Sequence, residues 1–251
     1  MSTTTPTFND DSHRKEKTAR SRAEHIGTKE KILRAARELF NEQGVEAVTV
    51  RHIAARIGIS HGNLCYHFPR KEDIIMALYQ GVVEGMSREI EGWRNRSGAE
   101  SSPLALVLQT ITVSYALQYE NRFLMIDFVN IMRRIPEIRT HFRAVFLLRK
   151  EQFTRELLHL RDEGYLRDDL ADADYENLAL HAYQMGDFWL SEAEILFDGE
   201  ESRKLTTYTA LACSMLVPYL SERGRDAYAR IMKSLFPDNL NKGREINKSA
   251  F

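Results

Sequence analysis

The sequence predicts an all-α protein built from two helical domains. Apolar residues recur at three- and four-residue spacing along most of the chain, which is the period of a helix buried on one face. No series of strand-like segments interrupts this pattern, and the 251 residues include few glycines (13) and prolines (6). A chain of this length accommodates one large domain or two modest ones. We expect a flexible basic arm over residues 1–27, a compact helical domain over 28–80, a larger helical domain over 81–240 and a C-terminal tail over 241–251.

The first predicted helix covers residues 28–44. Thr28 can cap its start, and Gly44 can close its end. The apolar residues of this segment fall on one helical face, which is typical of a helix packed on a core. They are Ile32, Leu33, Ala36, Leu39 and Phe40.

Two short helices that cross at a sharp turn are predicted over residues 49–71. Gly58 would end the first helix with a left-handed backbone, and Ser60 is a good N-cap for the second. Ala54 is small, so it lets the second helix cross the first closely. The residues that we expect to pack inward are Val50, Ile53, Ala54, Ile57, Ile59 and Leu64.

The second short helix keeps a polar outer face. The residues expected to point away from the helix pair are His61, Gly62, Asn63, Tyr66 and His67. Hydrogen-bonding side chains and one glycine near a helix start suit the edge of a DNA major groove. The 20-residue core alone is equally compatible with a compact helix pair that binds no DNA, so the flanking residues have to decide.

Those flanking residues match a known pattern. The elements are Lys31-Ile-Leu-x-Ala-Ala-x-x-Leu-Phe, Gly44, Thr49-Val-x-x-Ile-Ala, Gly58-Ile-Ser and Tyr66-His-Phe-x-x-Lys71, followed by a helix with Ile74, Ile75 and Leu78. Over about the first third of the chain they resemble the TetR family of bacterial transcription regulators. The resemblance implies an N-terminal three-helix helix-turn-helix DNA-binding domain and a C-terminal helical bundle for regulation and dimerisation.

The resemblance also implies which residues contact double-stranded DNA. Those with a phosphate role would mainly be Thr49, Tyr66, His67 and Lys71, while His61, Gly62 and Asn63 would face base edges. The complete set expected at the DNA interface is Thr49, Arg51, Ser60, His61, Gly62, Asn63, Tyr66, His67 and Lys71.

Positive charge is concentrated near the N-terminus. The whole chain is almost neutral, with 35 basic and 36 acidic residues, but residues 12–37 hold nine basic and three acidic residues, a formal charge of +6. Phosphates attract such a segment without any reading of sequence. The arm over 1–27 could reach a minor groove. A solvated tail that only aids solubility explains it equally well.

Beyond residue 98 the pattern predicts a helical bundle. The expected helices cover residues 103–119, 121–134, 136–163, 172–196, 202–220 and 225–236. Pro103 and Pro136 suit first-turn positions, where the missing amide hydrogen costs nothing. Gly164 would end the long helix, and Asp172 or Asp174 could cap the next one.

The two penultimate helices, over 172–196 and 202–220, are apolar on more than one face. A helix of this kind buries one face in its own core and needs a partner for the other. By the family resemblance, these helices form a four-helix interface in a homodimer, which is also the commonest oligomer. A monomer with an unusually thick core is the alternative.

Aromatic and methionine residues, Tyr183 among them, gather in the second domain, mixed with the polar residues His181, Gln184 and Asp187. Ligand pockets in bundles are mostly apolar with a few oriented polar groups, so this set could line a site for a small hydrophobic effector. It could equally be closed core. The residues expected at the effector site are Tyr115, Tyr119, Phe123, Phe128, Phe146, His181, Gln184, Met185, Phe188 and Trp189.

Several classes of function find no support in the sequence. It contains no HExxH, GxSxG, GxxxxGK[ST] or GxGxxG motif, so we expect no enzyme and no cofactor. Cys65 and Cys213 show no metal-ligand spacing, and a redox role for Cys65 is less plausible than simple packing. No apolar run is long enough to span a bilayer and no secretory signal is evident, so we expect no membrane partner and a cytoplasmic location.

Taken together, the sequence predicts a homodimeric transcription regulator, specifically a repressor, that binds a partly palindromic operator and releases it when a small molecule binds the bundle. One alternative keeps the DNA-binding domain but makes the bundle a docking surface for a protein, as in TetR-like adaptors. A second alternative is an enzyme fused to a DNA-binding module, which would need a cofactor that the sequence does not indicate.

Overall fold

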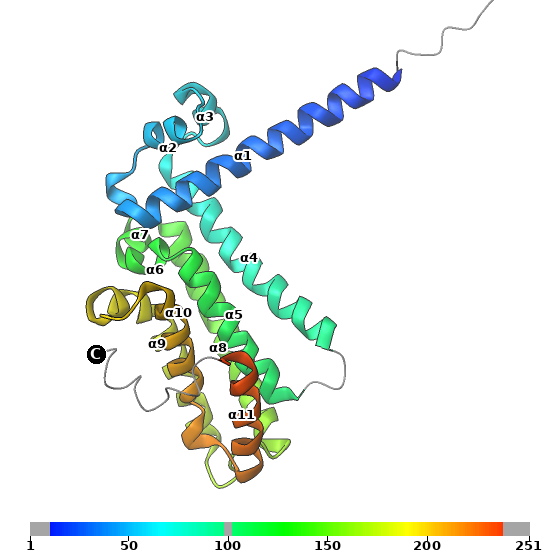
Figure 1. Ribbon diagram of the computed structural model, residues 1–251, viewed down its shortest axis with the longest axis vertical. Coiled ribbons are helices and arrows are strands. Elements are labelled where there is room, and N and C mark those ends of the chain that lie inside the picture. Colours follow the sequence, from blue (N-terminus) through cyan, green and yellow to red (C-terminus); the bar gives the residue numbers. More distant parts are fainter. Residues whose placement is uncertain (1–10, 98–101, 238–251) are drawn as a thin grey trace, which may run out of the picture. The chain divides into compact units, whose positions relative to one another are not determined.

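The structure, a computed structural model, describes the backbone of residues 11–97 and 102–237. Within these ranges every regular element is helical, which confirms the predicted fold class (Figure 1). The chain divides between Leu78 and Tyr79 into two compact units, which are described separately below. No helix in the described ranges is both long and apolar enough to cross a membrane.

The first unit contains three helices and the start of a fourth. Their bounds are α1 Asp11–Ala47, α2 Val50–Arg56, α3 His61–His67 and α4 Lys71–Ser97. Helix α2 packs against both α1 and α3. The core of this unit is made of buried apolar side chains from all four helices and their connections: Ile32, Ala36, Leu39, Phe40, Val45, Val48, Ile53, Ala54, Leu64, Phe68, Ile74 and Ile75.

Helix α1 begins earlier than the sequence pattern indicated. We expected a start at Thr28, whereas the helix begins at Asp11. Residues 11–27 contain no proline and one glycine, and their Arg, Lys, Glu and Ala residues favour helix, so nothing in this segment stops it. Near the other end, Gly44 has a left-handed backbone (φ 77°), which interrupts the helix where we expected it to end. Residues 1–10 of the expected arm lie outside the described residues.

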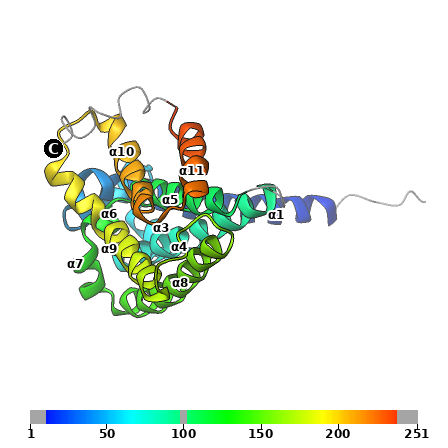
Figure 2. The same ribbon diagram turned by 90° about the horizontal axis from the view of Figure 1, so that it is seen from below.

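The second unit is a helical bundle. Its elements are the remainder of α4, α5 Pro103–Glu120, α6 Phe123–Ile126, α7 Phe128–Arg134, α8 Pro136–Asp162, α9 Asp172–Leu196, α10 Glu201–Ser214, the short 3₁₀ helix η1 Val217–Tyr219 and α11 Glu222–Leu235. Helices α8 and α9 lie side by side, α10 and α11 both pack on α5, and α6 packs on α9 (Figures 1 and 2). The expected C-terminal tail over 241–251 is outside the described ranges.

Two of the predicted bundle helices are interrupted. The expected helix over 121–134 breaks at Asp127 into α6 and α7. The expected helix over 202–220 ends at Ser214, and its last residues form η1 around Pro218, which cannot donate a helical hydrogen bond. Pro103 and Pro136 do occupy the first turns of α5 and α8, as predicted.

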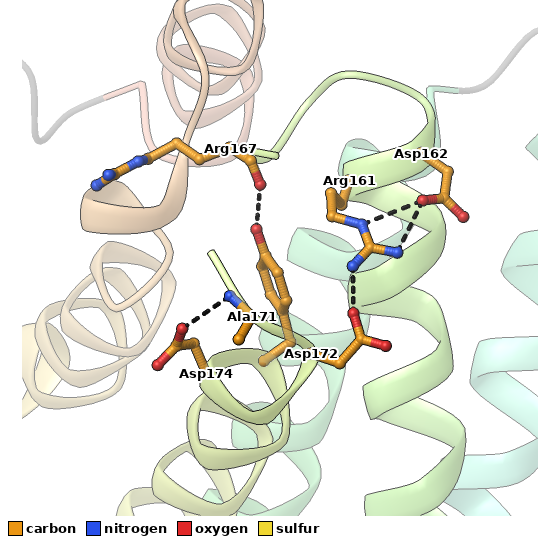
Figure 3. A network of polar contacts seen from close by, with 7 residues as sticks. Arg161, Asp162, Arg167, Ala171, Asp172 and Asp174 are labelled. Carbon is orange, nitrogen blue, oxygen red and sulfur yellow. Dashed lines mark hydrogen bonds and ion pairs between the residues drawn. The ribbon is translucent and has the colours of Figure 1, made fainter. Parts of the chain in front are cut away.

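The connection between α8 and α9 is held by a polar network (Figure 3). Arg161 at the end of α8 forms ion pairs with Asp162 and with Asp172 at the start of α9. The Tyr175 hydroxyl donates to the Arg167 carbonyl, and Asp174 accepts from the Ala171 amide at 3.0 Å. The N-cap of α9 is therefore Ala171 and neither of the two expected aspartates: Asp174, three residues further on, accepts from the Ala171 amide, and Asp172 pairs with Arg161.

Candidate nucleic-acid interface and bundle interior

Helix α3 is fixed at its start by local chemistry. Gly58 has a left-handed backbone (φ 69°), and the Ile59 amide donates to the Ala54 carbonyl at 3.1 Å. Ser60 is the N-cap, and its Oγ accepts from the Asn63 amide at 3.1 Å. Both sequence predictions for this turn, Gly58 as the break and Ser60 as the cap, are confirmed.

The packing of α3 leaves its polar face outside. Leu64 is fully buried, and Ala54 is only 3% exposed, as expected for a small residue where two helices cross. His61, Gly62 and Asn63 are exposed, and so is the Tyr66 side chain, at 76%. The segment beginning at Ser60 is therefore a helix whose hydrogen-bonding residues face solvent.

Gly62 is not required by packing inside the protein. A Cβ atom at this position would meet no other atom within 4 Å, and its backbone is ordinary helix. A helix interior disfavours glycine by roughly 1 kcal/mol relative to alanine. Gly62 therefore lowers the stability of the helix without making room for any other part of the protein. Such a glycine is expected on a surface where another molecule approaches the backbone closely.

Thr49 and Arg51 lie at the start of α2. The Thr49 side chain accepts from the His52 amide at 3.3 Å, so Thr49 is the N-cap of this helix. Arg51 is exposed. The neighbouring Arg56 is committed to α1, because its guanidinium pairs with Glu42 at 3.1 Å.

Lys71 has a structural role that the sequence did not reveal. Its ammonium donates to the Val45 carbonyl at 2.7 Å and to the Val48 carbonyl at 3.0 Å. Val45 lies near the end of α1 and Val48 in the connection from α1 to Thr49, so Lys71 ties the end of α1 to that connection. The phosphate contact expected of Lys71 stays a prediction. His67 is partly buried, with its ring edge-on to Tyr66 at 5.4 Å between centroids.

Cys65 lies on α3 and is partly buried. Its sulfur is 3.4 Å from Nε2 of His61, one turn earlier on the same helix. Within the described parts of the chain, no three His, Cys, Asp or Glu residues gather in a way that could hold a metal ion.

The ten residues expected at an effector site do not form one group. Phe123 and Trp189 are core residues, each only 1% exposed. The Trp189 ring stacks on that of Tyr115, with 5.0 Å between centroids, and its indole N–H donates to the Gln118 side chain at 2.7 Å. Met185 packs against the same cluster, and the Tyr119 hydroxyl donates to Glu201 at 2.6 Å. The residues left on the outer face of α9 are His181, Gln184 and Phe188.

Phe128 and Phe146 belong instead to a chain of rings that we call the aromatic array. Its members are Phe128, Phe142, Phe146, Phe153, Tyr183 and Phe188. Neighbouring rings meet mostly edge to face, at 5.0 Å for Phe128 and Phe142 and at 5.5 Å for Phe146 and Tyr183. Every ring of the array keeps some solvent-accessible surface, unlike the buried Trp189.

Two charged groups flank Tyr183. Burial raises the pKa of the Asp187 carboxyl to about 7. Arg149 on α8 is also partly buried, and burial lowers the pKa of its guanidinium. Arg149 donates to the Val83 carbonyl at 3.2 Å and to the Ser87 hydroxyl at 3.3 Å, and it contacts the Met86 thioether, all on α4. Arg149 was not among the predicted site residues, because a single arginine in a long helix carries no signal of burial.

A polar depression of about 540 Å³ lies elsewhere in the second unit, at the α8–α9 connection. It is lined mainly by charged residues, including Arg161, Arg167 and Arg225. Arg161 and Arg167 are already paired with aspartates. This surface does not suit a hydrophobic effector, because most of the side chains that line it are charged.

Comparisons with known proteins agree with the two-unit organisation. A family model described as "Bacterial regulatory proteins, tetR family" matches residues 32–78, and the TetR model described as "Bacterial transcriptional repressor" matches residues 87–228. The HTH-type transcriptional repressor KstR2 of Rhodococcus jostii (strain RHA1) is 36% identical over 92 residues, which are 36% of this chain. The matched segment spans about two fifths (42%) of that relative's length.

Solved structures share the fold more completely. A TetR-family transcriptional regulator from Marinobacter aquaeolei VT8 superposes with a TM-score of 0.70 at 23% identity, covering 82% of this chain and 98% of that one. The SmeT–triclosan complex superposes with a TM-score of 0.55 at 25% identity, covering 78% of this chain and 93% of that one.

Proposed function

The chain belongs to the TetR family of bacterial transcriptional regulators. From this premise we propose that it is a DNA-binding repressor that acts as a ligand-responsive homodimer on a palindromic operator. The observation that carries the DNA-binding part is α3, whose polar residues face solvent while Ser60 and Leu64 fix the helix in place. His61, Gly62 and Asn63 would meet base edges in the major groove, and Thr49, Arg51, Tyr66, His67 and Lys71 would contact or position the backbone.

Exposed apolar side chains on α9 and beyond support the homodimer. Phe188, Ile195 and Leu196 on α9 are 51%, 79% and 46% exposed, and Leu211 and Val217 further along are 41% and 42% exposed. Large apolar surface of this kind marks an interaction site more often than chance exposure. A two-fold interface would cover it with the same surface of a second copy and would set two α3 helices one helical turn of DNA apart, about 34 to 36 Å.

The aromatic array supports the ligand-responsive part. Six rings with residual accessible surface and few polar groups match the composition of small-molecule sites. SmeT, a neighbour by structure, is named as a complex with triclosan. A ligand that prefers one spacing of the two DNA-binding units over another would shift the population away from the operator-bound state.

Selection from a random duplex pool tests the DNA-binding proposal. The full-length protein should enrich a sequence with two inverted half-sites whose centres lie about ten base pairs or a multiple apart. A protein with His61→Ala and Asn63→Ala should enrich no such sequence while keeping the wild-type thermal unfolding. Enrichment of an unrepeated site by the wild-type protein would contradict the palindrome.

Sedimentation tests the homodimer. Ile195→Asp should shift the protein from dimer to monomer, because it buries a charge at the proposed interface. Leu147→Asp on α8 is the matched control, since Leu147 is also exposed (65%) but lies on another helix. Equal mass distributions for the two variants would rule out α9 as the interface.

Leu147 and Leu148, 65% and 54% exposed on α8, favour one second candidate function. Adjacent exposed leucines could dock a protein partner, so the bundle would act as an adaptor rather than as an effector sensor. This candidate predicts that Leu147→Asp abolishes regulation in cells while the purified variant still dimerises and binds its operator. Unchanged regulation by Leu147→Asp would exclude it.

A further inference from the structure

Helix α4 belongs to both units of the protein. It runs from Lys71 to Ser97, and the chain divides between Leu78 and Tyr79, inside this helix. Tyr79 is 5% exposed, but from Gln80 onward none of the α4 residues whose burial the structure describes is buried. Because apolar burial holds this part of α4 only weakly, its polar contacts carry more of its attachment to the second unit.

Arg149 of α8 contacts three residues in one turn of α4. Its guanidinium donates to the Val83 carbonyl at 3.2 Å and to the Ser87 hydroxyl at 3.3 Å, and it also contacts the Met86 thioether. The Ser87 hydroxyl in turn donates to the Val83 carbonyl at 3.1 Å. The guanidinium, the hydroxyl and the carbonyl are therefore joined pairwise by hydrogen bonds, which hold this turn of α4 against α8.

No carboxylate accounts for the position of Arg149. Within the described ranges none of its hydrogen bonds goes to an acidic side chain, whereas Arg161 and Arg167 are each paired with an aspartate. Arg149 is partly buried, and a charged group that leaves water needs other hydrogen-bond partners. Its acceptors lie on α4, so Arg149 gains them only while α4 stays beside it.

A second contact from α8 lies closer to the unit boundary. The Tyr79 hydroxyl and Nδ1 of His141 are 3.0 Å apart, and the two rings meet edge to face at 5.6 Å between centroids. The contacts of Tyr79 with His141 and of Ser87 with Arg149 both join residues 62 positions apart in the sequence, so they follow α4 and α8 in the same direction. Two points of attachment fix the direction of α4 along α8, where one point would let it pivot.

Gly81 lies on α4 between these two contacts. A Cβ atom at this position would meet no other atom within 4 Å, so packing does not require the glycine. Glycine weakens a helix relative to alanine. Helix α4 is thus weakened in the stretch that α8 holds, which makes the contacts from α8 more important for its course.

We propose that Arg149 is a positioning residue for operator binding: it fixes the course of α4 along α8 and, through this continuous helix, the spacing at which a homodimer presents its two DNA-binding units. Arg149 itself would not touch DNA. This inference rests on the proposed function, since only a dimer on a palindromic operator has such a spacing to fix.

Operators with altered spacing test this role. One extra base pair between the half-sites moves them apart by about 3.4 Å and rotates them by about a tenth of a helical turn. In anisotropy titrations at one fixed salt concentration, the full-length wild-type protein should bind the selected operator roughly tenfold or more tightly than the version with the inserted base pair. The reason is that DNA-binding units held at one spacing fit only one of the two duplexes.

Arg149→Met removes the hydrogen-bond donors and keeps much of the length of the side chain. It should bind the selected operator roughly threefold more weakly than the wild type and distinguish the two spacings by less than about threefold, because a loosely held α4 lets the units adapt to either. A duplex with a single half-site should bind Arg149→Met and the wild type equally, which a general loss of folded protein would not allow. Unequal binding of the half-site, or wild-type discrimination between the spacings by Arg149→Met, would overturn the inference.

Arg155→Met is the matched control. Arg155 is an exposed arginine on the same helix, and its only printed partner within the described ranges is Glu151 of α8 itself, at 3.8 Å. Arg155→Met should therefore discriminate between the two spacings as the wild type does. An equal loss of discrimination in Arg155→Met and Arg149→Met would show that the contact with α4 is not the cause.

Ser87→Ala tests the same contact from the other helix. Ser87 is exposed and alanine favours a helix more than serine does, so this variant keeps its fold. It should reduce the discrimination between spacings by roughly twofold or more, and in the Arg149→Met background it should change nothing further, because both substitutions remove the same hydrogen bond. Unchanged discrimination in Ser87→Ala, or effects of the two substitutions that multiply, would contradict the inference.

The proposed function and this inference fail in different ways. If the wild-type protein selects no palindrome, or binds both spacings equally, the homodimer on a palindromic operator is refuted and the inference falls with it. If the wild type discriminates between the spacings and both Arg149→Met and Ser87→Ala discriminate equally well, only the inference is wrong.

Discussion

Replacing Asp187 with asparagine should make the second unit more stable, and increasingly so as the pH rises. The pKa of this carboxyl is raised by burial from 3.8 to about 7. Between these two values the folded state binds more protons than the unfolded state, so the stability of the wild-type protein falls as the pH rises. At about 1.4 kcal/mol per pKa unit, the total penalty above pH 7 is about 4 kcal/mol.

Asparagine cannot ionise, so Asp187→Asn loses this pH dependence. Its amide has a burial cost of its own, about 1–3 kcal/mol, but that cost is the same at every pH. The difference in unfolding free energy between Asp187→Asn and wild type should therefore increase by about 3 kcal/mol from pH 5 to pH 8. A comparison across pH thus separates the ionisation of Asp187 from every fixed effect of the substitution.

Urea denaturation followed by tryptophan fluorescence is the suitable assay, at equal protein concentration for all variants. Both tryptophans of the chain, Trp93 and Trp189, belong to the second unit, so the signal reports its unfolding. Glu192→Gln, which removes an exposed carboxylate from the same helix, should run parallel to the wild type at both pH values. A constant difference between Asp187→Asn and wild type from pH 5 to pH 8 would show that Asp187 ionises as it does in water, and the burial argument would be refuted.

Three further substitutions test other parts of the structure. Gly62→Ala should stabilise the first unit by up to about 1 kcal/mol, because alanine favours a helix and its methyl group meets no other atom of the protein. The same methyl group should weaken operator binding in fluorescence anisotropy, because it would stand between α3 and the DNA. An unchanged operator affinity would contradict this explanation of the glycine. Lys71→Met should destabilise the first unit by about 1–3 kcal/mol in circular dichroism melts, because it removes the Lys71 ammonium that donates to the carbonyls of Val45 and Val48. A stability equal to that of the wild type would show that these two hydrogen bonds are dispensable. Gly224→Ala should destabilise the second unit by about 3 kcal/mol or more, because the added Cβ would overlap the carbonyl oxygen of Tyr165. Gly81→Ala is the control and should not have this effect, because a Cβ at Gly81 would lie in open space. Equal melting temperatures of the two variants would count against the close approach of α11 to the Tyr165 backbone.

Local chemistry made the helix-turn-helix predictable. Gly58, Ser60 and the buried Leu64 act within a few residues of their own positions, so the turn, the cap and the outward polar face follow from the order of residues. The same holds for Pro103 and Pro136, whose missing amide hydrogens fit the first turns of α5 and α8.

Features that depend on distant contacts were not predictable. The sequence shows an abundance of aromatic residues but not which rings meet, so Trp189 and Phe128 looked alike although one is core and the other belongs to the array. Similarly, the pattern of α8 gives no sign that Arg149 turns toward the α4 backbone, since that depends on which helix packs beside it. The role of Lys71 in holding the turn at Val48 was hidden for the same reason.

The affinity of Asn63→Ala for DNA decides whether α3 reads base edges. The exposed Asn63 side chain is placed on this helix by the cap at Ser60. In anisotropy titrations with the selected operator and a scrambled duplex at one fixed salt concentration, Asn63→Ala should lose roughly tenfold to a hundredfold in operator affinity and keep its affinity for the scrambled duplex. Equal losses on both duplexes, or no loss on either, would contradict base reading by this helix.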